Sequence, residues 1–226
     1  MNNLITIGLP SKGRLKEKSI SFFNDRGLKI IQSEKERNYF GTIENKPNVK
    51  IIFLHAKEII QRLGDGTLDI GVSGLDLLKE SDKNLQGKIN IQKKLDYGNA
   101  NLVIAVPDDW IDVQTIADLE EISFDIRLKR NTRLRVATKY PNLTNDFLIS
   151  KGVTQYKLIP SLGATETYPF IGSSEIITDI TSTGKTLADN NLRVLKDGLI
   201  LSSRACLFIA KKKAAKLQPF LKSLGR

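Results

Sequence analysis

Short apolar runs alternate with helix-like segments along almost the whole sequence, and this alternation is the feature that most constrains the fold. The apolar runs have the length of buried strands and lie at residues 4–9, 49–54, 68–72, 100–106, 134–138, 156–159 and 176–180. Helical periodicity follows most of them, at residues 15–26, 56–63, 75–78, 115–119, 142–150 and 186–190. Because a crossover helix lets the two strands that it joins run parallel, the sequence predicts an α/β fold with parallel sheet.

The pattern continues to the end of the sequence and predicts how the domains are divided. Residues 192–201 and 205–210 have the pattern of two further strands, and a terminal helix is expected from about Lys213. Gly27 and Gly64 are expected to end the first two helices, Gly27 in the left-handed conformation. No internal repeat, low-complexity stretch or long linker divides the sequence. We therefore predict two domains joined by more than one crossing: domain I at residues 1–95 plus 195–226, and domain II at residues 96–194.

The charge of the chain alone does not identify a partner. Lys and Arg number 35 against 25 Asp and Glu, so the net charge is +10. Such a charge would suit nucleic acid, a membrane surface or small polyanionic substrates. Aromatic residues make up only 7% of the sequence and do not interleave with the basic clusters at residues 127–135 and 211–216. A stacking surface for nucleic acid is therefore poorly supported, and we predict no nucleic-acid partner.

Cysteine and histidine are too scarce for several kinds of site. The sequence has one cysteine, Cys206, and one histidine, His55, which excludes an internal disulfide and a multi-thiolate zinc site. We expect Cys206 to be a core thiol and His55 to be packed at the end of a strand. No apolar window reaches the roughly 18 residues of a membrane span, and the start of the chain lacks a signal-peptide pattern. These features predict a soluble cytoplasmic protein without a membrane partner.

The most informative segment is residues 176–187, with the sequence IITDITSTGKTL. An apolar strand carries Asp179 near its end, and a hydroxyl-rich loop with Gly184 follows before a helix begins. Glycine permits close approach of a phosphate to the backbone, and consecutive amides with hydroxyl groups can bind it. A carboxylate just before such a loop is placed to accept hydrogen bonds from sugar hydroxyls. The segment favours a phosphorylated ribose, and the alternative is that its Ser and Thr residues merely cap a helix.

Common phosphate-binding motifs do not account for this segment. It lacks both the G-x-x-x-x-G-K-S/T pattern of a P-loop and the G-x-G-x-x-G pattern of a dinucleotide site. Residues 183–186, with the sequence TGKT, partly resemble the loop of the common class of phosphoribosyltransferases. That class normally places two adjacent acids before the loop, whereas Thr178 precedes Asp179 in this sequence.

Further blocks occur in one order along nearly the whole chain. They are LPSKGR at residues 9–14, LDIGVSGLDLL at 68–78, AVP at 105–107, ATKYP at 137–141, SLGATETYP at 161–169 and GSSEIITDITSTGKTL at 172–187. In combination these blocks closely resemble the ATP phosphoribosyltransferase family, which opens histidine biosynthesis. The chain is about as long as members of the short form of that family. The resemblance therefore implies a catalytic subunit that needs a histidyl-tRNA-synthetase-like partner.

The resemblance implies a fold, a reaction and partners. The implied fold is two α/β domains of the periplasmic-binding-protein-like type II architecture, with an interdomain cleft. The implied reaction transfers the phosphoribosyl group of phosphoribosyl pyrophosphate to N1 of ATP and releases pyrophosphate. Because the sugar gains oxocarbenium character, such a reaction depends mainly on orientation and electrostatic stabilisation. Mg²⁺ is expected on the substrate and not in a protein cage, and the expected partners are ATP, phosphoribosyl pyrophosphate, the regulatory subunit and a second catalytic chain.

The resemblance also assigns roles to individual residues. The catalytic residues are expected to be Asp179, Glu166 and Arg14. The phosphoribosyl pyrophosphate site is expected to contain Asp179, Thr181, Ser182, Thr183, Gly184, Lys185 and Thr186. The ATP site is expected to contain Lys12, Gly13, Arg14, Gly71, Ser73, Gly74, Asp76, Lys139 and Tyr140.

The main alternative function is that of a non-catalytic, two-domain binding module for a small nucleotide ligand. Such a module would share the architecture, because a fold does not fix a function. It would bind nucleotide but release no pyrophosphate.

Overall fold

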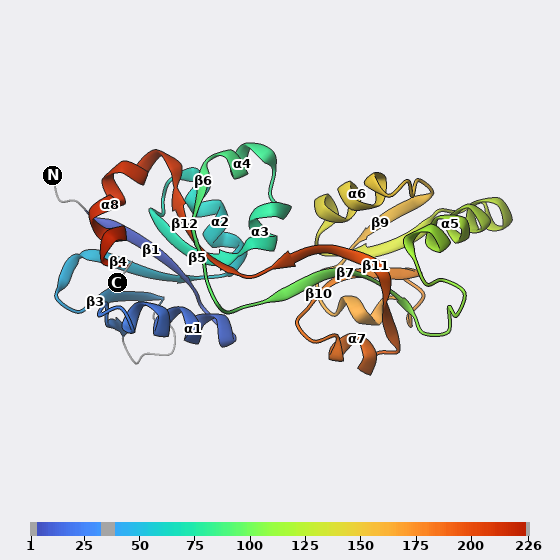
Figure 1. Cartoon of the computed structure of the whole chain (residues 1–226), viewed down its shortest axis with the longest axis horizontal. Coiled ribbons are helices and arrows are strands. Elements are labelled where there is room, and N and C mark those ends of the chain that lie inside the picture. Colours follow the sequence, from blue (N-terminus) through green and yellow to red (C-terminus); the bar gives the residue numbers. More distant parts are fainter. Residues whose placement is uncertain (1–3, 33–38, 225–226) are drawn as a thin grey trace. The chain divides into compact units, whose positions relative to one another are not determined.

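The computed structural model describes residues 4–32 and 39–224 of the chain. The protein divides into two compact units, each with its own sheet (Figure 1). Unit 1 comprises Met1–Gly98 and Arg204–Arg226, and unit 2 comprises Asn99–Ser203. The chain therefore passes between the two units twice.

The sheet of unit 1 is mixed. Among the described residues it has seven strands, in the order β2-β3-β4-β1-β5-β12-β6. β1 runs parallel to β4 and β5, as the sequence predicts, but β12 runs antiparallel to β5 and β6, and β3 antiparallel to β4. The antiparallel strands arise because a hairpin and the returning C-terminal segment add to the parallel centre. The strands are β1 Ile5–Pro10, β2 Ile30–Gln32, β3 Phe40–Ile43, β4 Lys46–Leu54, β5 Ile70–Gly74, β6 Ile89–Lys94 and β12 Ala205–Ala210.

Helices cover both faces of this sheet and form two apolar cores. Helices α1 and α8 contribute Phe23 and Leu217 to one core, and helices α2 and α3 contribute Ile59 and Leu78 to the other. Cys206 is fully buried in the second core, which confirms the prediction of a core thiol. The helices of unit 1 are α1 Gly13–Asn24, α2 Ala56–Asp65, α3 Leu75–Glu80, α4 Lys83–Gly87 and α8 Ala214–Ser223, the last preceded by the 3-10 turn η2 Lys211–Lys213.

Two glycines allow α2 to lie close against the parallel strands. Gly8 of β1 is paired with Gly71 of β5. A Cβ atom at Gly71 would lie 2.5 Å from Cγ2 of Ile59 on α2, and one at Gly8 would lie 2.5 Å from Cδ1 of Leu68. Any larger residue would push the helix away from the sheet, so this glycine pair positions α2 and the turn before it.

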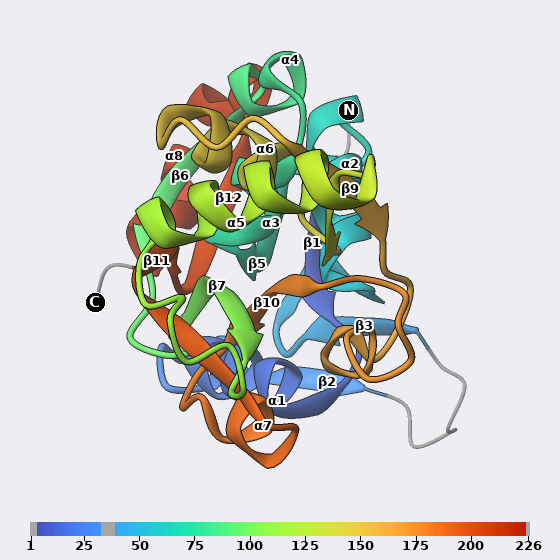
Figure 2. The same cartoon turned by 90° about the vertical axis from the view of Figure 1, so that its right-hand side faces the viewer.

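The sheet of unit 2 places three parallel strands beside an antiparallel pair. Among the described residues its order is β11-β7-β10-β8-β9. β8 runs parallel to β9 and β10, whereas β7 runs antiparallel to both β10 and β11. Figure 2 shows α5 and α6 on one side of this sheet and α7 on the other. The elements are β7 Ala100–Pro107, α5 Ile116–Arg130, β8 Leu134–Thr138, α6 Pro141–Ser150, β9 Tyr156–Pro160, the 3-10 turn η1 Thr165–Thr167, β10 Ile176–Thr181, α7 Lys185–Asp189 and β11 Leu192–Ser203.

Several predicted boundaries differ from the structure. Helix α2 continues through Gly64 and ends at Gly66, which adopts the left-handed conformation with φ of 82°. Gly64 is needed for another reason, because a Cβ atom there would overlap the side chain of Leu85. The predicted return to the first domain at residue 195 is also too early, because β11 stays paired with β7 up to Ser203.

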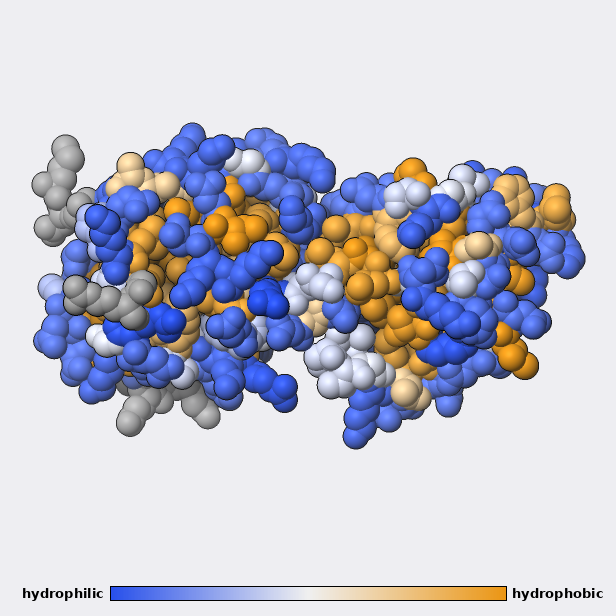
Figure 3. Space-filling model, in the orientation of Figure 1, coloured by the Kyte–Doolittle hydropathy of each residue, from blue (hydrophilic) through white to orange (hydrophobic). Residues whose placement is uncertain are grey.

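Helix α5 is much longer than the segment 115–119 that the periodicity predicts. It starts with a capping box between Thr115 and Asp118 and continues to Arg130. Its apolar residues do not keep to one face, since Phe124 and Leu128 are 41% and 80% exposed. Apolar side chains are visible on the surface of unit 2 in Figure 3. An apolar residue on the solvent side weakens the periodic signal, which explains why the sequence indicates only the first turn.

A buried carboxylate joins the two terminal segments of unit 1. Asp69 is 3% exposed, and its Oδ2 accepts hydrogen bonds from the backbone and hydroxyl of Thr6 at 2.7 and 2.9 Å. Its Oδ1 lies 2.7 Å from Nζ of Lys213, which also donates to the carbonyl of Gly66 at 2.9 Å. Burial raises the pKa of Asp69, but the bonds from Lys213 and Thr6 outweigh it, so the pKa is lowered overall.

We predict that Lys213→Met lowers the free energy of unfolding by about 1–3 kcal/mol, because it leaves a buried carboxylate without its cation. Lys212→Met, which replaces the exposed neighbour, should have little effect. A carboxylate with a lowered pKa stabilises the fold above its unfolded pKa and loses that effect as the pH falls through its folded pKa. The loss of unfolding free energy caused by Lys213→Met should therefore be measurable by urea unfolding between pH 5 and 7. It should shrink below about pH 4. A difference that does not change with pH would contradict the role of Asp69.

Candidate functional site

Three parallel strands of unit 2 end at one edge of the sheet, here called its carboxyl edge. Lys139 follows β8, Ser161 follows β9, and Asp179 lies near the end of β10. The register pairs Thr138 with both Pro160 and Thr178, so β8 and β9 end level with one another and β10 continues to Thr181. Ligands of open α/β sheets bind outside the carboxyl ends of parallel strands. The fold therefore gathers the predicted unit 2 residues at the edge where a ligand is expected.

The loop between β10 and α7 is closed by its own hydroxyl groups. The Gly184 amide donates to Oγ1 of Thr181 at 2.8 Å, and the Lys185 amide donates to Oγ1 of Thr183 at 3.3 Å. Gly184 has φ of 75°, and nothing lies within 4 Å of the Cβ atom that another residue would add there. The side chains of Ser182, Thr183, Lys185 and Thr186 are exposed. The loop thus presents hydroxyls, a cation and an open glycine backbone to an anion.

The length of α7 limits what the helix itself contributes. It has five residues, Lys185–Asp189. A macrodipole grows with the number of aligned peptide units, so most of the attraction for an anion must come from the loop groups.

Asp179 shares its surroundings with Glu166 and Lys139, two other predicted residues. Burial is the main cause that raises the pKa of Asp179, and the nearby Glu166 carboxylate raises it further. The Ile180 amide, which donates to Oδ1 of Asp179 at 2.9 Å, and the positive charge of Lys139 act in the opposite direction. The net pKa is raised, so Asp179 takes up a proton more readily than an exposed aspartate does.

Two residues that the sequence analysis did not single out hold the turn that carries Glu166. The hydroxyls of Ser161 and Thr165 lie 2.9 Å apart, and both side chains are buried. Thr165 begins η1, the turn that contains Glu166. Their position inside the block at residues 161–169 was the available signal, but only the structure shows that their hydroxyls face one another.

Lys139 and Tyr140 are adjacent in sequence but differ in exposure. Lys139 is exposed, whereas Tyr140 is 7% exposed. The Tyr140 amide donates to Oγ1 of Thr138 at 2.9 Å, and that hydroxyl also lies 3.2 Å from Oγ1 of Thr144 on α6. The Thr138 hydroxyl therefore ties the start of α6 to the end of β8, and Lys139 is the more accessible residue of the two.

Unit 1 has a corresponding carboxyl edge, where β4, β1 and β5 end. Lys12, Gly13 and Arg14 follow β1 and are exposed, and Gly13 has φ of 67°. The Ser11 amide donates to the carbonyl of Leu54 at 2.9 Å, which ties this turn to the end of β4. Two exposed cations beside an open glycine backbone make this turn suitable for a polyanion.

The remaining predicted residues of unit 1 are less accessible. Ser73 is fully buried and donates to the carbonyl of Ala56 at 2.7 Å, and Gly71 lies beneath Ile59 as described above. Gly74 is partly exposed and Asp76 is 6% exposed, and a Cβ atom on Gly74 would overlap the Asp76 carboxylate. The structure therefore gives Gly71 and Ser73 packing contacts, while Gly74 and Asp76 remain at the edge.

His55 lies at the same edge but is exposed, which corrects the expectation of a packed residue. It is the N-cap of α2, and its Nδ1 accepts a hydrogen bond from the Lys57 amide at 3.3 Å. Capping groups stand outside the first helical turn, which explains the exposure.

The described parts of the chain contain no group of three or more His, Cys, Asp or Glu side chains that could hold a metal ion. Within residues 4–32 and 39–224, no helix combines the length and the apolar character needed to cross a membrane.

Comparisons with known proteins all indicate the same family. The family model described as ATP phosphoribosyltransferase matches residues 55–225. The ATP phosphoribosyltransferase of Brucella melitensis biotype 2 is 45% identical over 209 residues, which cover 92% of this chain and 90% of that protein. The ATP phosphoribosyltransferase of a Chelativorans species is 45% identical over 210 residues, covering 92% and 91%.

Solved structures agree with the same family and with the predicted architecture. A chain of the ATP phosphoribosyl transferase (HisG:HisZ) complex from Thermotoga maritima superposes with a TM-score of 0.74 at 25% identity, covering 98% of this chain and 97% of that chain. A histidine kinase sensor domain described as similar to periplasmic binding proteins gives a TM-score of 0.56 at 14% identity, covering 98% and 89%. The second likeness shows the fold alone, and it confirms the expected type of architecture.

The surroundings of Asp179 lead to a paired prediction. Glu166→Gln should lower the pKa of Asp179, because it removes a negative charge that disfavours the ionised form. Lys139→Met should raise the same pKa, because it removes a positive charge. A carbon-13 NMR titration of the Asp179 carboxyl measures both shifts, with Glu121→Gln on the exposed side of α5 as a control that should change neither. Shifts of the same sign in the two variants would show that these charges do not share one site.

Proposed function

The chain belongs to the ATP phosphoribosyltransferase family, and we propose that its substrates bind at the two carboxyl edges described above. The enzymes of this family transfer the phosphoribosyl group of phosphoribosyl pyrophosphate to N1 of ATP and release pyrophosphate, in the first step of histidine biosynthesis. This chain is accordingly a glycosyltransferase with that activity. The observation that carries the site assignment is the closed, glycine-containing loop at residues 181–184, which lies beside Asp179.

The loop of unit 2 binds the 5′-phosphate of phosphoribosyl pyrophosphate in this proposal. The hydroxyl groups of residues 181–186 supply the hydrogen bonds, and Lys185 adds a positive charge. Gly184 leaves room for a phosphate close to the main chain, because nothing lies within 4 Å of the place where another residue would carry its Cβ atom. A phosphate fixed in this way orients the ribose for attack at C1′.

Asp179 and Glu166 act on the ribose. Their carboxylates accept hydrogen bonds from the ribose hydroxyls, and their negative charge stabilises the oxocarbenium character of the sugar as pyrophosphate leaves. The buried pair Ser161 and Thr165 positions Glu166 for this role. The partial burial of Asp179 strengthens its electrostatic effect, since the surrounding dielectric is lower than that of water.

A magnesium ion fits this carboxylate pair. Glu166 raises the pKa of Asp179, so the two carboxylates repel one another, and a bound cation would relieve that repulsion. Asp179 and Glu166 would hold Mg²⁺ through its retained waters, with the substrate phosphates as its main ligands. When bound, the ion neutralises the charge of the departing pyrophosphate.

ATP is assigned to the carboxyl edge of unit 1. Lys12 and Arg14 contact phosphate groups, and Gly13 lets those groups approach the backbone. Gly74 and Asp76 line the nucleoside side of the same edge, while Gly71 and Ser73 support it from the interior. On unit 2, Lys139 adds a charge for the anionic substrates and Tyr140 fixes the backbone that carries it.

The partner and the cellular site follow from the family. The Thermotoga maritima relative is described in a HisG:HisZ complex. We therefore assign to this chain a histidyl-tRNA-synthetase-like regulatory subunit in a hetero-oligomer, with the catalytic chains paired as homodimers. A biosynthetic enzyme that uses ATP and phosphoribosyl pyrophosphate is expected to act in the cytoplasm.

The role of Gly184 can be separated from its effect on stability. Gly184→Ala and Gly152→Ala both introduce a Cβ atom at positive φ with nothing within 4 Å, so both should cost about 1 kcal/mol of stability. Only Gly184→Ala should also raise the KM for phosphoribosyl pyrophosphate, by at least about tenfold, because it displaces the phosphate. Steady-state kinetics and thermal unfolding of the two variants provide the comparison. Equal KM values in folded variants would place the phosphate elsewhere.

The activity itself is measured by mixing the chain with ATP, phosphoribosyl pyrophosphate and Mg²⁺ and following adduct absorbance and pyrophosphate release. We expect both products, and we expect the synthetase-like subunit to raise the rate and to make it sensitive to histidine. Asp179→Asn should lower kcat/KM at least about tenfold, equivalent to about 1.4 kcal/mol of transition-state stabilisation. Nucleotide binding without pyrophosphate release, with or without the subunit, would favour the non-catalytic binding module.

A further inference from the structure

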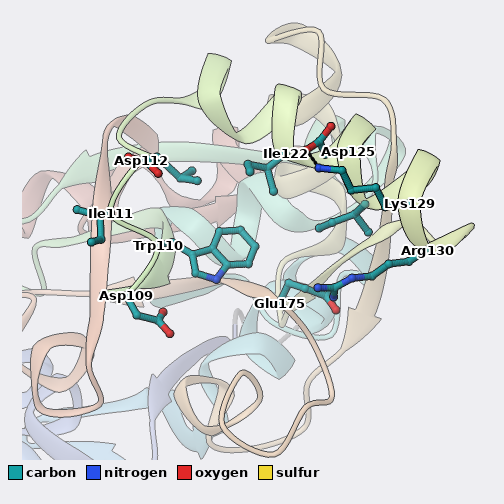
Figure 4. A pocket seen from close by; sticks show the side chains of 11 residues that line it. Asp109, Trp110, Ile111, Asp112, Ile122, Asp125, Lys129, Arg130 and Glu175 are labelled. Atoms are coloured by element: carbon teal, nitrogen blue, oxygen red, sulfur yellow. Dashed lines mark hydrogen bonds and ion pairs between the residues drawn. The ribbon is translucent and has the colours of Figure 1, made fainter.

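Trp110, the one tryptophan of the sequence, lies between two cavities of unit 2. One cavity, of 440 Å³, is formed by the loop after β7 and helix α5, and Figure 4 shows the indole ring at its centre. The other, of 570 Å³, is formed by Trp110 and the segment 169–175, and is here called the Phe170 cavity. Both volumes are in the range that small-molecule sites occupy.

The Phe170 cavity lies at the opposite edge of the sheet from the phosphate loop. Its lining includes Pro107 at the end of β7 and Glu175 just before β10. The six residues of β10 separate this edge from Thr181, a distance of roughly 20 Å. The cavity is therefore distinct from the substrate site proposed above, and the inference does not depend on that proposal.

Apolar rings give the Phe170 cavity a surface for a flat or apolar ligand. Trp110, Phe170, Pro107 and Pro169 contribute to it, and Phe170 is 59% exposed, so the cavity is open to solvent. The loop that carries Trp110 is held in place, because the Arg193 guanidinium donates to the carbonyls of Trp110 and Val113. Aromatic rings on a fixed backbone can bind a ring by stacking, or a cation by its attraction to their faces.

The charges in the Phe170 cavity favour a cation. Glu175 and Arg135 neutralise one another through a two-pronged ion pair, with Nη2 to Oε1 at 2.6 Å and Nε to Oε2 at 3.2 Å. Asp108 and Asp109 are the other charged residues of the lining, and both are exposed. Within the lining these two aspartates leave a net negative charge that attracts a positive group, while the nearby Arg193 guanidinium is engaged by the carbonyls of Trp110 and Val113.

A buried polar group in the same lining has no partner. Ser174 is 2% exposed, and its hydroxyl makes no hydrogen bond within the described residues. A buried hydroxyl without a partner is unfavourable, and such groups in native proteins call for an explanation. Because Ser174 lines the cavity, a polar group of a ligand would provide the missing partner once the hydroxyl turned toward it.

We propose that the Phe170 cavity is a binding site for a small organic monocation that carries an aromatic ring, with the ring against Trp110 and Phe170 and the cationic group beside Asp108 and Asp109. Charge complementarity selects this class over an anion, and the ring-lined surface selects it over a simple inorganic cation.

The single tryptophan makes the test direct, because all intrinsic tryptophan fluorescence of the chain comes from Trp110. The full chain is titrated at low ionic strength with three probes of similar size: 2-phenylethylamine, 2-phenylethanol and phenylacetate. We expect a saturable change in fluorescence with the amine, at an affinity at least about fivefold above that for the neutral alcohol, and the weakest binding for the anion. Equal affinities for the three probes, or no saturable response to any, would overturn the proposal.

Variants then locate the binding. Asp109→Asn and Phe170→Ala should each weaken binding of the amine, and Asp109→Asn should also reduce its advantage over the alcohol. Asp146→Asn, an exposed carboxylate on α6 outside the cavity, is the matched control and should leave the affinity unchanged. Circular dichroism verifies that each variant is folded. If Asp146→Asn weakened binding of the amine as much as Asp109→Asn, the amine would not bind in this cavity. Fluorescence that changed with protein concentration and not with the amine would show that the cavity has another occupant.

Discussion

Parallel pairing of three strands in each unit is the constraint on which the remaining features depend. In unit 1 the register of β1 with β4 and β5 brings the turn at residues 11–14 level with the turn at residues 74–76. In unit 2 the register of β8 with β9 and β10 does the same for Lys139, Glu166 and Asp179, which come from three separate segments of the sequence. Strands β12 and β7, which run antiparallel to β5 and β10, place their amino ends at these edges.

Electrostatics gives the two edges of the unit 2 sheet different preferences. At the carboxyl edge, Lys139 and Glu166 lie near Asp179, and the adjoining loop adds hydroxyls and Lys185, a combination suited to a sugar that carries phosphate groups. At the opposite edge, Asp108 and Asp109 stand beside aromatic rings and an ion pair that is already neutral. The net charge of +10 therefore describes neither edge alone, because the sheet keeps the two environments apart.

The order of strands and helices could be predicted because most of them carry a clear periodic pattern. The hydroxyl-rich loop between β10 and α7 could be predicted because its glycine and hydroxyls are contiguous. Other features depend on contacts between distant residues. The role of Gly64 requires knowledge of Leu85, the role of Gly71 requires Ile59, and the hydroxyl pair of Ser161 and Thr165 requires the turn that brings them together. Helix α5 was underestimated because Phe124 and Leu128 place apolar side chains on its solvent side. A single sequence contains no direct record of such contacts.

Binding of phosphoribosyl pyrophosphate at the carboxyl edge of unit 2 is tested most directly by mapping amide chemical shifts. The nitrogen-15-labelled chain is titrated with phosphoribosyl pyrophosphate and Mg²⁺, without ATP, and backbone amide signals are followed by NMR. The largest shifts are expected at residues 181–186, with further shifts at Lys139 and Glu166 and little change at residues 108–113. Shifts confined to residues 108–113 or to unit 1, with residues 181–186 unchanged, would contradict phosphate binding by this loop.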